Sequence, residues 1–523
     1  MKNLSAGLRT LILLSVLIFS LSSCKKVHDN SYLEEITIAE LQQGYKDGKF
    51  TIKEVVEDYL KRIEAIDKNG PKLNSIISIN PDAIRIAEEL DKEMAEGKIR
   101  GPLHGIPVIL KDNIDTRDSM PTTAGATVLR NSFAKQDSWV AKKLREAGAI
   151  IIAKSNLSEW ANFRANLSSS GWSGVGGQTK NPYITDRNPC GSSSGSGVAT
   201  SASLCAIAIG TETNGSIVCP SNNNGIVGLK PTVGLISRAG IVPISFTQDT
   251  PGPMGRTVED VAITLGILTG VDSSDSKTLA SAGIFKTDYT QFLKKEGLKG
   301  KRIGLITNIS GFHFKVDSLM KNTVKFIKSQ GAEVVEITFP MPGGISAASF
   351  QVMLYEFKDG LNKYFATLDS TVPVRSLADL IEFNKKDSIE LRYFDQQILV
   401  MAQSKGGLDS PEYKQFLAKM LKGMREDGMD KVMNEYKLDA MIAPTGAPAW
   451  KTDLINGDNF LGSSSSYAAV SGYPSITVPM GFIDELPVGI SFFGRAWSEP
   501  LLLEIAYAFE QGTKQRRAPK FLE

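Results

Sequence analysis

Histidine is the commonest base in enzymes with a serine nucleophile, yet this sequence has only three, His28, His104 and His313. His28 lies in a polar stretch near the N-terminus, His104 in a Gly-Pro turn and His313 between two phenylalanines. Because the three are scattered along the chain, they argue against a Ser-His-Asp triad and against a metal site built from histidines. Hydrolytic chemistry in this chain would therefore depend on another base.

Two short motifs keep other serine mechanisms open. Gly191–Gly195 matches G-x-S-x-G centred on Ser193, but a nucleophile elbow follows a strand and this segment follows a turn. It also requires a downstream histidine, and His313 is the only one. Ser274–Lys277 matches S-x-x-K, but it lies in a polar loop and lacks the companion motifs of that class. Both motifs remain as alternative serine mechanisms.

Lysine is the remaining type of base, and Lys111 is placed to act as one. It follows the apolar run Ile106–Leu110, which is bounded by Gly and Pro and predicts a buried strand. Burial disfavours the ammonium form, so it lowers the pKa of a lysine from about 10.4 towards the range near 7 that suits a general base. Taken alone, a lysine is more often a solvated surface charge.

The elements that would hold these groups alternate between helices and strands. Apolar residues three and four apart predict helices between Ile36 and Leu90, one of which starts at Thr51 with the capping-box partner Glu54. The predicted order then continues with a strand at 106–110, a helix at 137–147 ended by Gly148, a strand at 150–153, a Gly- and Ser-rich loop at 168–197, a helix at 196–204, a strand at 206–209 and a second loop at 210–220. The first loop is too long for a simple connection, which indicates a functional segment.

The same alternation resumes in the second half of the chain. Strands are predicted at 302–306, 334–337, 438–443 and 475–479, with a mainly helical region at 345–430. This pattern predicts an α/β fold in which helices surround a mixed, mostly covered central sheet. No stretch has the composition of a flexible linker, so residues 31–523 are predicted to form a single large domain.

The composition narrows the class of function. Of the 523 residues, 42% are hydrophobic and 22% are charged, as in ordinary globular proteins that bury a large core. The 59 basic and 57 acidic side chains leave a net charge of +2, which gives no reason to expect a nucleic-acid partner. No motif indicates a metal or an organic cofactor, and nothing in the sequence indicates the oligomeric state.

The N-terminus has the pattern of an export signal. Two basic residues precede the apolar run Leu11–Leu21, which has the length of a signal-peptide core and is shorter than the ~20 residues of a membrane span. The run ends in Leu-Ser-Ser-Cys, which resembles the cleavage box of bacterial lipoproteins. We therefore predict a signal peptide at 1–23, a lipidated Cys24 and a polar tether at 24–30, with a buried N-terminal helix as the alternative. The protein would then be exported and anchored by lipid to a membrane of the cell envelope.

Three further cysteines are present, Cys190, Cys205 and Cys219. No pair has C-x-x-C spacing, so neither a zinc site nor a redox motif is indicated. Cys190 and Cys219 flank the Gly- and Ser-rich loops, and their pairing is left open. Buried, unpaired cysteines are the favoured interpretation.

Several segments, taken together in order and spacing, resemble the amidase signature family. The main ones are Gly101–Asn113 (GPLHGIPVILKDN), Gly191–Gly197 (GSSSGSG) and Gly210–Ile217 (GTETNGSI). The similarity continues at Gly228–Thr232, Gln248–Met254, Ala443–Thr445 and Gly472–Pro479. Since the series extends over most of the chain, it is far more specific than any one of its segments.

The resemblance implies a catalytic site without histidine. The family's catalytic lysine falls on Lys111, its bridging serine, preceded by a cis peptide bond, on Ser192, and its nucleophile on Ser216. It implies an oxyanion hole formed by the backbone N–H groups of Thr213, Asn214, Gly215 and Ser216. In this scheme the proton of Ser216 passes through Ser192 to neutral Lys111, the alkoxide attacks the amide carbonyl, and water cleaves the acyl-enzyme.

The resemblance also implies the class of substrate, a small-molecule or peptide amide cleaved to an acid and ammonia or an amine. Relatives that act on glutamine-like substrates often carry an arginine two residues after the nucleophile, where this chain has Val218. A carboxylate clamp is therefore not expected there. Glu212–Val218 and Phe246–Thr250 look most similar to the peptide amidase branch, which removes C-terminal amides, and the segments Phe163–Asn166 and Gly176–Pro182 agree with that branch. The alternatives are an esterase or aryl-acylamidase on the same scaffold, and a non-catalytic surface lipoprotein that binds amides or peptides.

Overall fold

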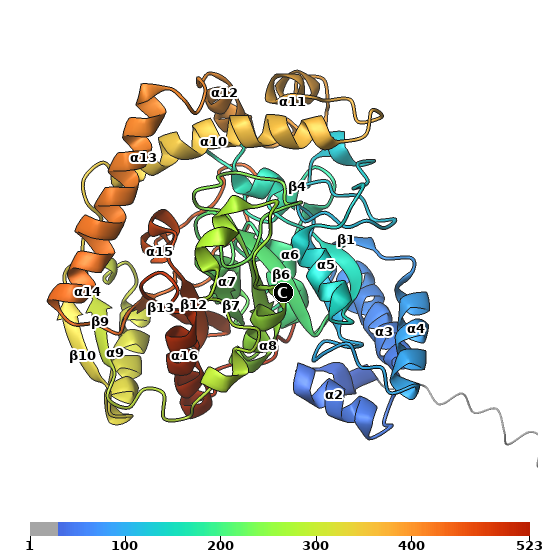
Figure 1. Ribbon diagram of the computed structural model, residues 1–523, viewed down its shortest axis with the longest axis horizontal. Helices are drawn as coiled ribbons and strands as arrows, with labels where there is room; N and C mark the ends of the chain where they lie inside the picture. The colour runs from blue at the N-terminus through green and yellow to red at the C-terminus, as the bar shows by residue number, and fades with distance from the viewer. Residues whose placement is uncertain (1–29) are drawn as a thin grey trace, which may run out of the picture.

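A mixed sheet of 11 strands runs through the structure, a computed structural model that describes residues 30–523 (Figure 1). The strand order across the sheet is β1-β3-β2-β6-β8-β7-β12-β13-β11-β9-β10. The strands are β1 (Ile76–Ile79), β2 (Pro107–Lys111), β3 (Ile150–Ser155), β6 (Ile207–Glu212), β7 (Val227–Lys230), β8 (Thr250–Gly255), β9 (Arg302–Ile306), β10 (Glu333–Ile337), β11 (Ala440–Pro444), β12 (Ser475–Ile483) and β13 (Leu486–Phe493). The predicted α/β fold with one large domain and a mixed central sheet is confirmed.

The segment before Asn30 lies outside the described residues. The predicted signal peptide, the lipidated Cys24 and the tether fall in that segment, except for Asn30 itself, which begins a short 3-10 helix at Asn30–Leu33.

Three neighbouring parallel strands lie at the predicted site, and the central one ends in Lys111. β2 pairs with β3 on one side and with β6 on the other, and Leu110 lies opposite Ile209. Lys111, the last residue of β2, is therefore next to the end of β6, where Thr211 and Glu212 lie. Both strands are fully buried, because helices cover the two faces of this part of the sheet.

Strands β7 and β8 were not predicted from the sequence. β8 reads TPGPMG and pairs antiparallel with both β6 and β7. Proline and glycine are typical of turns, so the sequence of this central strand predicts a turn instead. Gly252 shows why a small residue is needed there, since a Cβ atom at this position would lie 2.1 Å from the carbonyl oxygen of Leu229 on β7.

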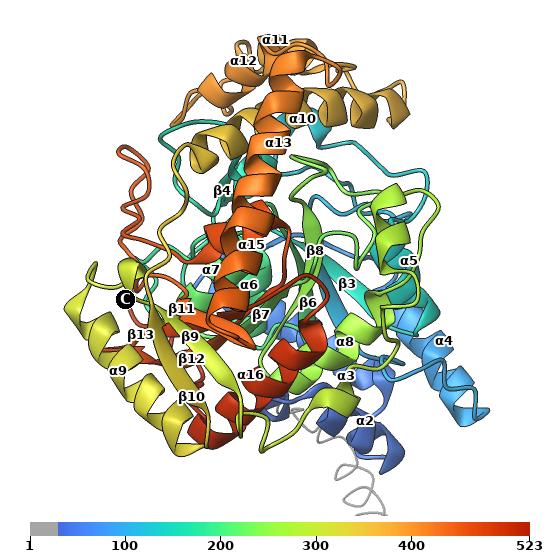
Figure 2. The same cartoon turned by 60° about the vertical axis from the view of Figure 1, so that its left-hand side comes forward.

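Helices cover the sheet and form an outer layer at one end (Figures 1 and 2). The α-helices are α2 (Ile38–Lys46), α3 (Ile52–Arg62), α4 (Ala83–Ala95), α5 (Trp139–Glu146), α6 (Ser194–Ser201), α7 (Val218–Asn223), α8 (Val258–Leu268), α9 (Phe314–Ser329), α10 (Ile345–Thr367), α11 (Leu377–Asn384), α12 (Gln397–Gln403), α13 (Pro411–Met424), α14 (Lys431–Glu435), α15 (Ser465–Ser471) and α16 (Glu499–Thr513). The predicted capping box is present at the start of α3, where Thr51 and Glu54 exchange hydrogen bonds. Helices α10, α11 and α12 lie at the top in both views, and α13 runs down from this layer towards α14.

Helix α6 is the small-residue helix expected from the sequence, and all of it is buried. Its glycines allow the neighbouring chain to come close. A Cβ atom on Gly195 would lie 2.3 Å from the carbonyl oxygen of Ser75 and 2.5 Å from that of Asn156. The start of α6, and with it the loop that carries Ser192, is thereby packed directly against β1 and β3.

Candidate active site

Lys111 is fully buried at the end of β2 and is hydrogen bonded to Ser192. Its Nζ lies 2.7 Å from Ser192 Oγ, 2.9 Å from Thr211 Oγ1 and 3.2 Å from the carbonyl oxygen of Thr211. The amine therefore has a defined position between the loop before α6 and the end of β6.

The surroundings of Lys111 favour its neutral form. Burial lowers the pKa of Lys111 to about 7, and this effect outweighs the negative charges of Asp249 and Glu212, which act in the opposite direction. A free amine at neutral pH can accept a proton, which a solvated lysine with its usual pKa near 10.4 cannot do.

The loop that carries Ser192 has the backbone geometry implied by the family resemblance. The peptide bond between Gly191 and Ser192 is cis. The carbonyl oxygen of Ser192 accepts a hydrogen bond from the Ser158 N–H at 3.0 Å, and the side chain is fully buried beside Lys111.

Ser216 lies on the second loop, which is joined to the first. The Ser193 N–H donates to the Ser216 carbonyl oxygen at 3.1 Å, so the two loops are in contact next to the two serines. Ser216 is 7% exposed, and within residues 30–523 its hydroxyl makes no hydrogen bond. The structure thus brings Lys111 and Ser192 into direct contact and leaves the Ser216 hydroxyl without a fixed partner.

The residues of the histidine alternatives have structural roles. His104 is buried with its Nε2 at 3.1 Å from the Leu90 carbonyl oxygen, and His313 accepts the Lys315 N–H at the start of α9. Ser193, the centre of the G-x-S-x-G match, bonds to the N–H and the carbonyl oxygen of Thr211. In the part of the chain that the structure describes, no serine is hydrogen bonded to a histidine side chain.

Glu212, for which the sequence predicted no individual role, organises the loop that carries Ser216. Its carboxylate accepts the N–H groups of Gly215 at 2.8 Å, Ile217 at 2.7 Å and Val218 at 3.0 Å. Gly215 has a φ of +86°, a conformation that favours glycine. The loop therefore folds around the buried Glu212 carboxylate, which fixes the backbone on both sides of Ser216.

This arrangement changes the expected oxyanion hole at one position. The Gly215 N–H donates to Glu212 and is engaged. By contrast, no group among residues 30–523 accepts a hydrogen bond from the N–H of Thr213, Asn214 or Ser216. Three of the four predicted donors thus remain available to a ligand.

Contacts from distant segments fix the position of the same loop. The Ser465 hydroxyl at the start of α15 donates to Asn214 Oδ1 at 2.7 Å, and Asn214 Nδ2 donates to Ser466 Oγ at 3.1 Å. On the other side, the Thr213 hydroxyl donates to Asp249 at 2.6 Å. Sequence reasoning did not identify these serines, because more than 240 residues separate them from the loop.

Cys190 and Cys219 form a disulfide, contrary to the favoured interpretation of unpaired cysteines. The two loops that carry Ser192 and Ser216 bring their Cα atoms to 5.9 Å, a distance that permits a disulfide. Spacing along the chain could not reveal this proximity. Cys205 is buried and unpaired, as expected.

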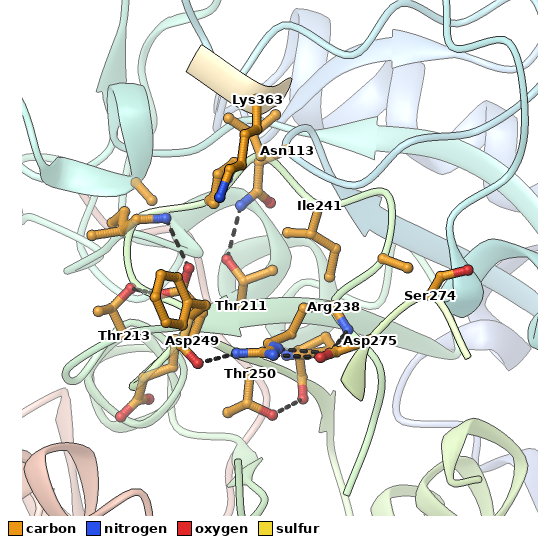
Figure 3. A pocket seen from close by; sticks show the side chains of 18 residues that line it. Asn113, Thr211, Thr213, Arg238, Ile241, Asp249, Thr250, Ser274, Asp275 and Lys363 are labelled. Atoms are coloured by element: carbon orange, nitrogen blue, oxygen red, sulfur yellow. Dashed lines mark hydrogen bonds and ion pairs between the residues drawn. The ribbon is translucent and has the colours of Figure 1, made fainter. Parts of the chain in front are cut away.

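A cavity of about 340 Å³ lies beside these groups (Figure 3). Asn113, Thr211 and Thr213 form its polar side, and Figure 3 shows Asn113 hydrogen bonded to Thr211. The segment Ala239–Ile244 and Phe246 form an apolar side. Thr211 separates the cavity from the Lys111–Ser192 pair, because its hydroxyl contacts both Lys111 and Asn113.

The chain is similar to proteins of known structure over almost its whole length. A peptide amidase in complex with the competitive inhibitor chymostatin has 48% identity and a TM-score of 0.90, covering 93% of this chain and 99% of that one. The native peptide amidase from Stenotrophomonas maltophilia has 47% identity and a TM-score of 0.89, with the same coverage. A protein named probable amidase from Arabidopsis thaliana is 41% identical and covers 98% of this chain and 97% of its own length.

The comparisons contradict the prediction of an exported, lipid-anchored protein of the cell envelope. The curated relatives that are 35% to 41% identical over more than 90% of this chain are plant and fungal amidases. The prediction depended on one short apolar run and a four-residue box, both of which are weak signals. Within residues 30–523, none of the helices combines the length and the apolar character that a membrane crossing requires.

The family comparison agrees with the fold. The model of the amidase family matches residues 54–503, which include β2, the loops that carry Ser192 and Ser216, and the strands β12 and β13. An amide-hydrolysing class follows from this match together with the peptide amidase similarity. The chain therefore belongs to the amidase signature family and is an amidohydrolase.

Proposed function

We propose that this amidohydrolase cleaves neutral carboxylic amides, including C-terminal peptide amides, through a Ser216–Ser192–Lys111 relay and an acyl-enzyme. The observation that carries the proposal is the 2.7 Å contact between the buried Lys111 Nζ and Ser192 Oγ. With a pKa of about 7, the buried amine of Lys111 is largely neutral at physiological pH, so it is suited to accept and release a proton.

The proposed reaction starts with proton transfer. Neutral Lys111 takes the proton of Ser192, Ser192 takes that of Ser216, and Ser216 Oγ attacks the amide carbonyl carbon. The developing oxyanion would accept hydrogen bonds from the N–H groups that Glu212 leaves available. Each such donor is worth about 10²–10³ in rate when it is placed in advance.

The same groups then transfer protons in the opposite direction. Ser192 returns a proton to the departing nitrogen, because an amine is a poor leaving group until it is protonated. The C–N bond breaks, ammonia or an amine leaves, and the acyl group stays on Ser216. Water, deprotonated through the same relay, attacks the acyl-enzyme and releases the acid.

The charges around the site support a neutral substrate. Val218 is buried where relatives that act on glutamine-like substrates often have an arginine. The cations at the cavity are paired: Arg238 Nε lies 2.7 Å from Asp275, and Lys363 lies 2.7 Å from Asp359. A free carboxylate on the substrate would therefore find no unpaired cation in this cavity.

A substrate panel tests this proposal. We expect amidated dipeptides to be hydrolysed with a higher kcat/KM than glutamine or malonamate, because the latter bring an uncompensated charge. Release of ammonia and of the acid product should be recorded for peptide amides, aliphatic amides, aryl acylamides and esters. Faster turnover of the carboxylate-bearing amides would refute the neutral-substrate assignment, and turnover of esters alone would favour an esterase.

The pH profile should show the ionisation of Lys111. Its neutral form is the active one, so kcat/KM should rise by about tenfold per pH unit below pH 7 and level off above it. Asp249 raises the pKa of Lys111, so Asp249→Asn should move the inflection to lower pH. Rates measured from about pH 5 to 10 with one peptide amide check both statements. A profile that falls as the pH rises through 7 would contradict a lysine base.

A further inference from the structure

The cavity beside the catalytic loops has the form of a binding subsite. Val242 and Ile244 line one side, and Phe246 contributes a ring that remains 36% exposed. A volume of about 340 Å³ is ample for one aromatic side chain and falls within the usual range of ligand pockets. The apolar walls favour an apolar group.

One buried polar atom at the cavity has no partner. Asn113 is 2% exposed, and its Nδ2 donates to Thr211 Oγ1 at 3.0 Å, while its Oδ1 has no hydrogen bond within the described residues. A buried acceptor without a partner destabilises the folded protein, so such an atom at a cavity points to a ligand that donates to it. Thr211 also contacts Lys111, so this acceptor lies at the end of the cavity nearest the proposed relay.

The charged groups at the cavity select against anions. Arg238 and Lys363 are occupied by Asp275 and Asp359, as described above. Asp249 lines the cavity, and its carboxylate accepts the Thr213 hydroxyl and the N–H groups of Ile244 and Ser245. A neutral ligand with an N–H donor fits this set, whereas a carboxylate would be repelled.

The apolar wall is held in place from the outer helical layer. Glu356 on α10 accepts the hydroxyls of Ser245 and Thr247 and the Thr247 N–H, on both sides of Phe246. Tyr413 on α13 donates to the same carboxylate at 2.7 Å. The wall is therefore held by hydrogen bonds within the protein.

We infer that this cavity binds the side chain of the amino-acid residue that carries the scissile amide, with Asn113 Oδ1 accepting the backbone N–H of that residue. The inference rests on the proposed function, because it takes a peptide amide as the substrate. It makes Asn113 and the wall at Ala239–Phe246 determinants of specificity: an apolar side chain fills the cavity, and the N–H satisfies the unpaired acceptor.

Filling the cavity tests the position of the side chain. Ala239 lines the cavity and is partly exposed, so Ala239→Phe should occupy the space. We expect the KM for N-acetylphenylalanine amide to rise by about tenfold or more, and the ratio of its kcat/KM to that of acetamide, which has no such side chain, to fall by about the same factor. Ala95→Phe on the exposed side of α4 is the matched control and should change neither value. If Ala239→Phe does not fold, Phe246→Ala removes a wall without adding volume and should raise the same KM.

A pair of substrates tests the hydrogen bond. The wild-type enzyme should prefer N-acetylphenylalanine amide over its Nα-methyl analogue by about tenfold in kcat/KM, because the methyl group removes the donor. Asn113→Ala should bring this ratio close to one. The ratio is the readout because Asn113 also bonds Thr211, so the absolute rate changes for both substrates.

Two outcomes separate this inference from the function on which it rests. An unchanged selectivity in the cavity variants, with amide hydrolysis intact, would overturn the subsite alone. A wild-type enzyme that hydrolyses none of these amides would overturn the proposed function and the subsite with it.

Discussion

Ser216→Ala should eliminate hydrolysis of amides and of esters alike, with a loss of about 10⁶-fold in kcat, the scale seen when a serine nucleophile is removed. The same variant should no longer be labelled by a fluorophosphonate. Ser216 is expected to make the covalent bond in both reactions, so no substrate bypasses it. The structure indicates that the loss will be chemical, because the Ser216 hydroxyl makes no hydrogen bond within residues 30–523 whose removal would disturb the loop.

The measurement needs a test of folding and a control substitution of a serine outside the site. Thermal unfolding of Ser216→Ala should match the wild type within a few degrees. Ser329→Ala, at the exposed end of α9, should leave rate and labelling unchanged. If the Ser216→Ala variant is still labelled, at another serine, the assignment of Ser216 as the nucleophile is wrong.

Lys111→Ala should lower amide hydrolysis by about 10²–10⁴-fold, the usual contribution of general acid–base catalysis. Ester hydrolysis should suffer less, because an alkoxide leaving group depends less on a proton delivered by the relay. Ser192→Ala should give losses between those of Lys111→Ala and Ser216→Ala. The rates of matched amide and ester substrates are the measurement. An amidase rate near that of the wild type in Lys111→Ala would exclude the relay.

Lys154 offers a matched control, because it too is a fully buried lysine at the end of a neighbouring strand. Its Nζ donates to the Ile114 carbonyl oxygen at 2.6 Å and to Thr122 Oγ1 at 3.1 Å, and it has no bond to Ser192 or Ser216. Lys154→Met should therefore reduce stability, while the folded fraction keeps its rate. Inactive but folded His104→Ala or His313→Ala variants would reopen the histidine triad.

Much of the sheet could be predicted because its strands are buried on both sides. The apolar runs at 106–110 and 150–153 correspond to the fully buried β2 and β3, with errors of one or two residues at their ends. A strand covered on both faces needs apolar residues at every position, and this pattern is visible without a structure. β8 lacks that pattern, because close contact with β7 requires Gly252 where an apolar side chain would be expected.

The candidate site could be predicted only as far as its motifs extend. Lys111, Ser192 and Ser216 lie in short segments whose spacing is informative. Ser465 and Asp249 act on the nucleophile loop from other parts of the chain, and only the fold brings them there. The same holds for the disulfide, whose two cysteines became neighbours because two loops meet.

The strand order also determines when the fold can be completed during synthesis. β9, β10 and β11 connect to the rest of the sheet only through β12 and β13, which come last in the chain. While the ribosome is still making Ser475–Phe493, the nascent protein must hold two partial sheets with unpaired edges at β7 and β11. Open edges of this kind invite pairing with other chains. Faster synthesis of this last segment, or a chaperone that covers these edges, should therefore raise the soluble yield more than changes made near the N-terminus.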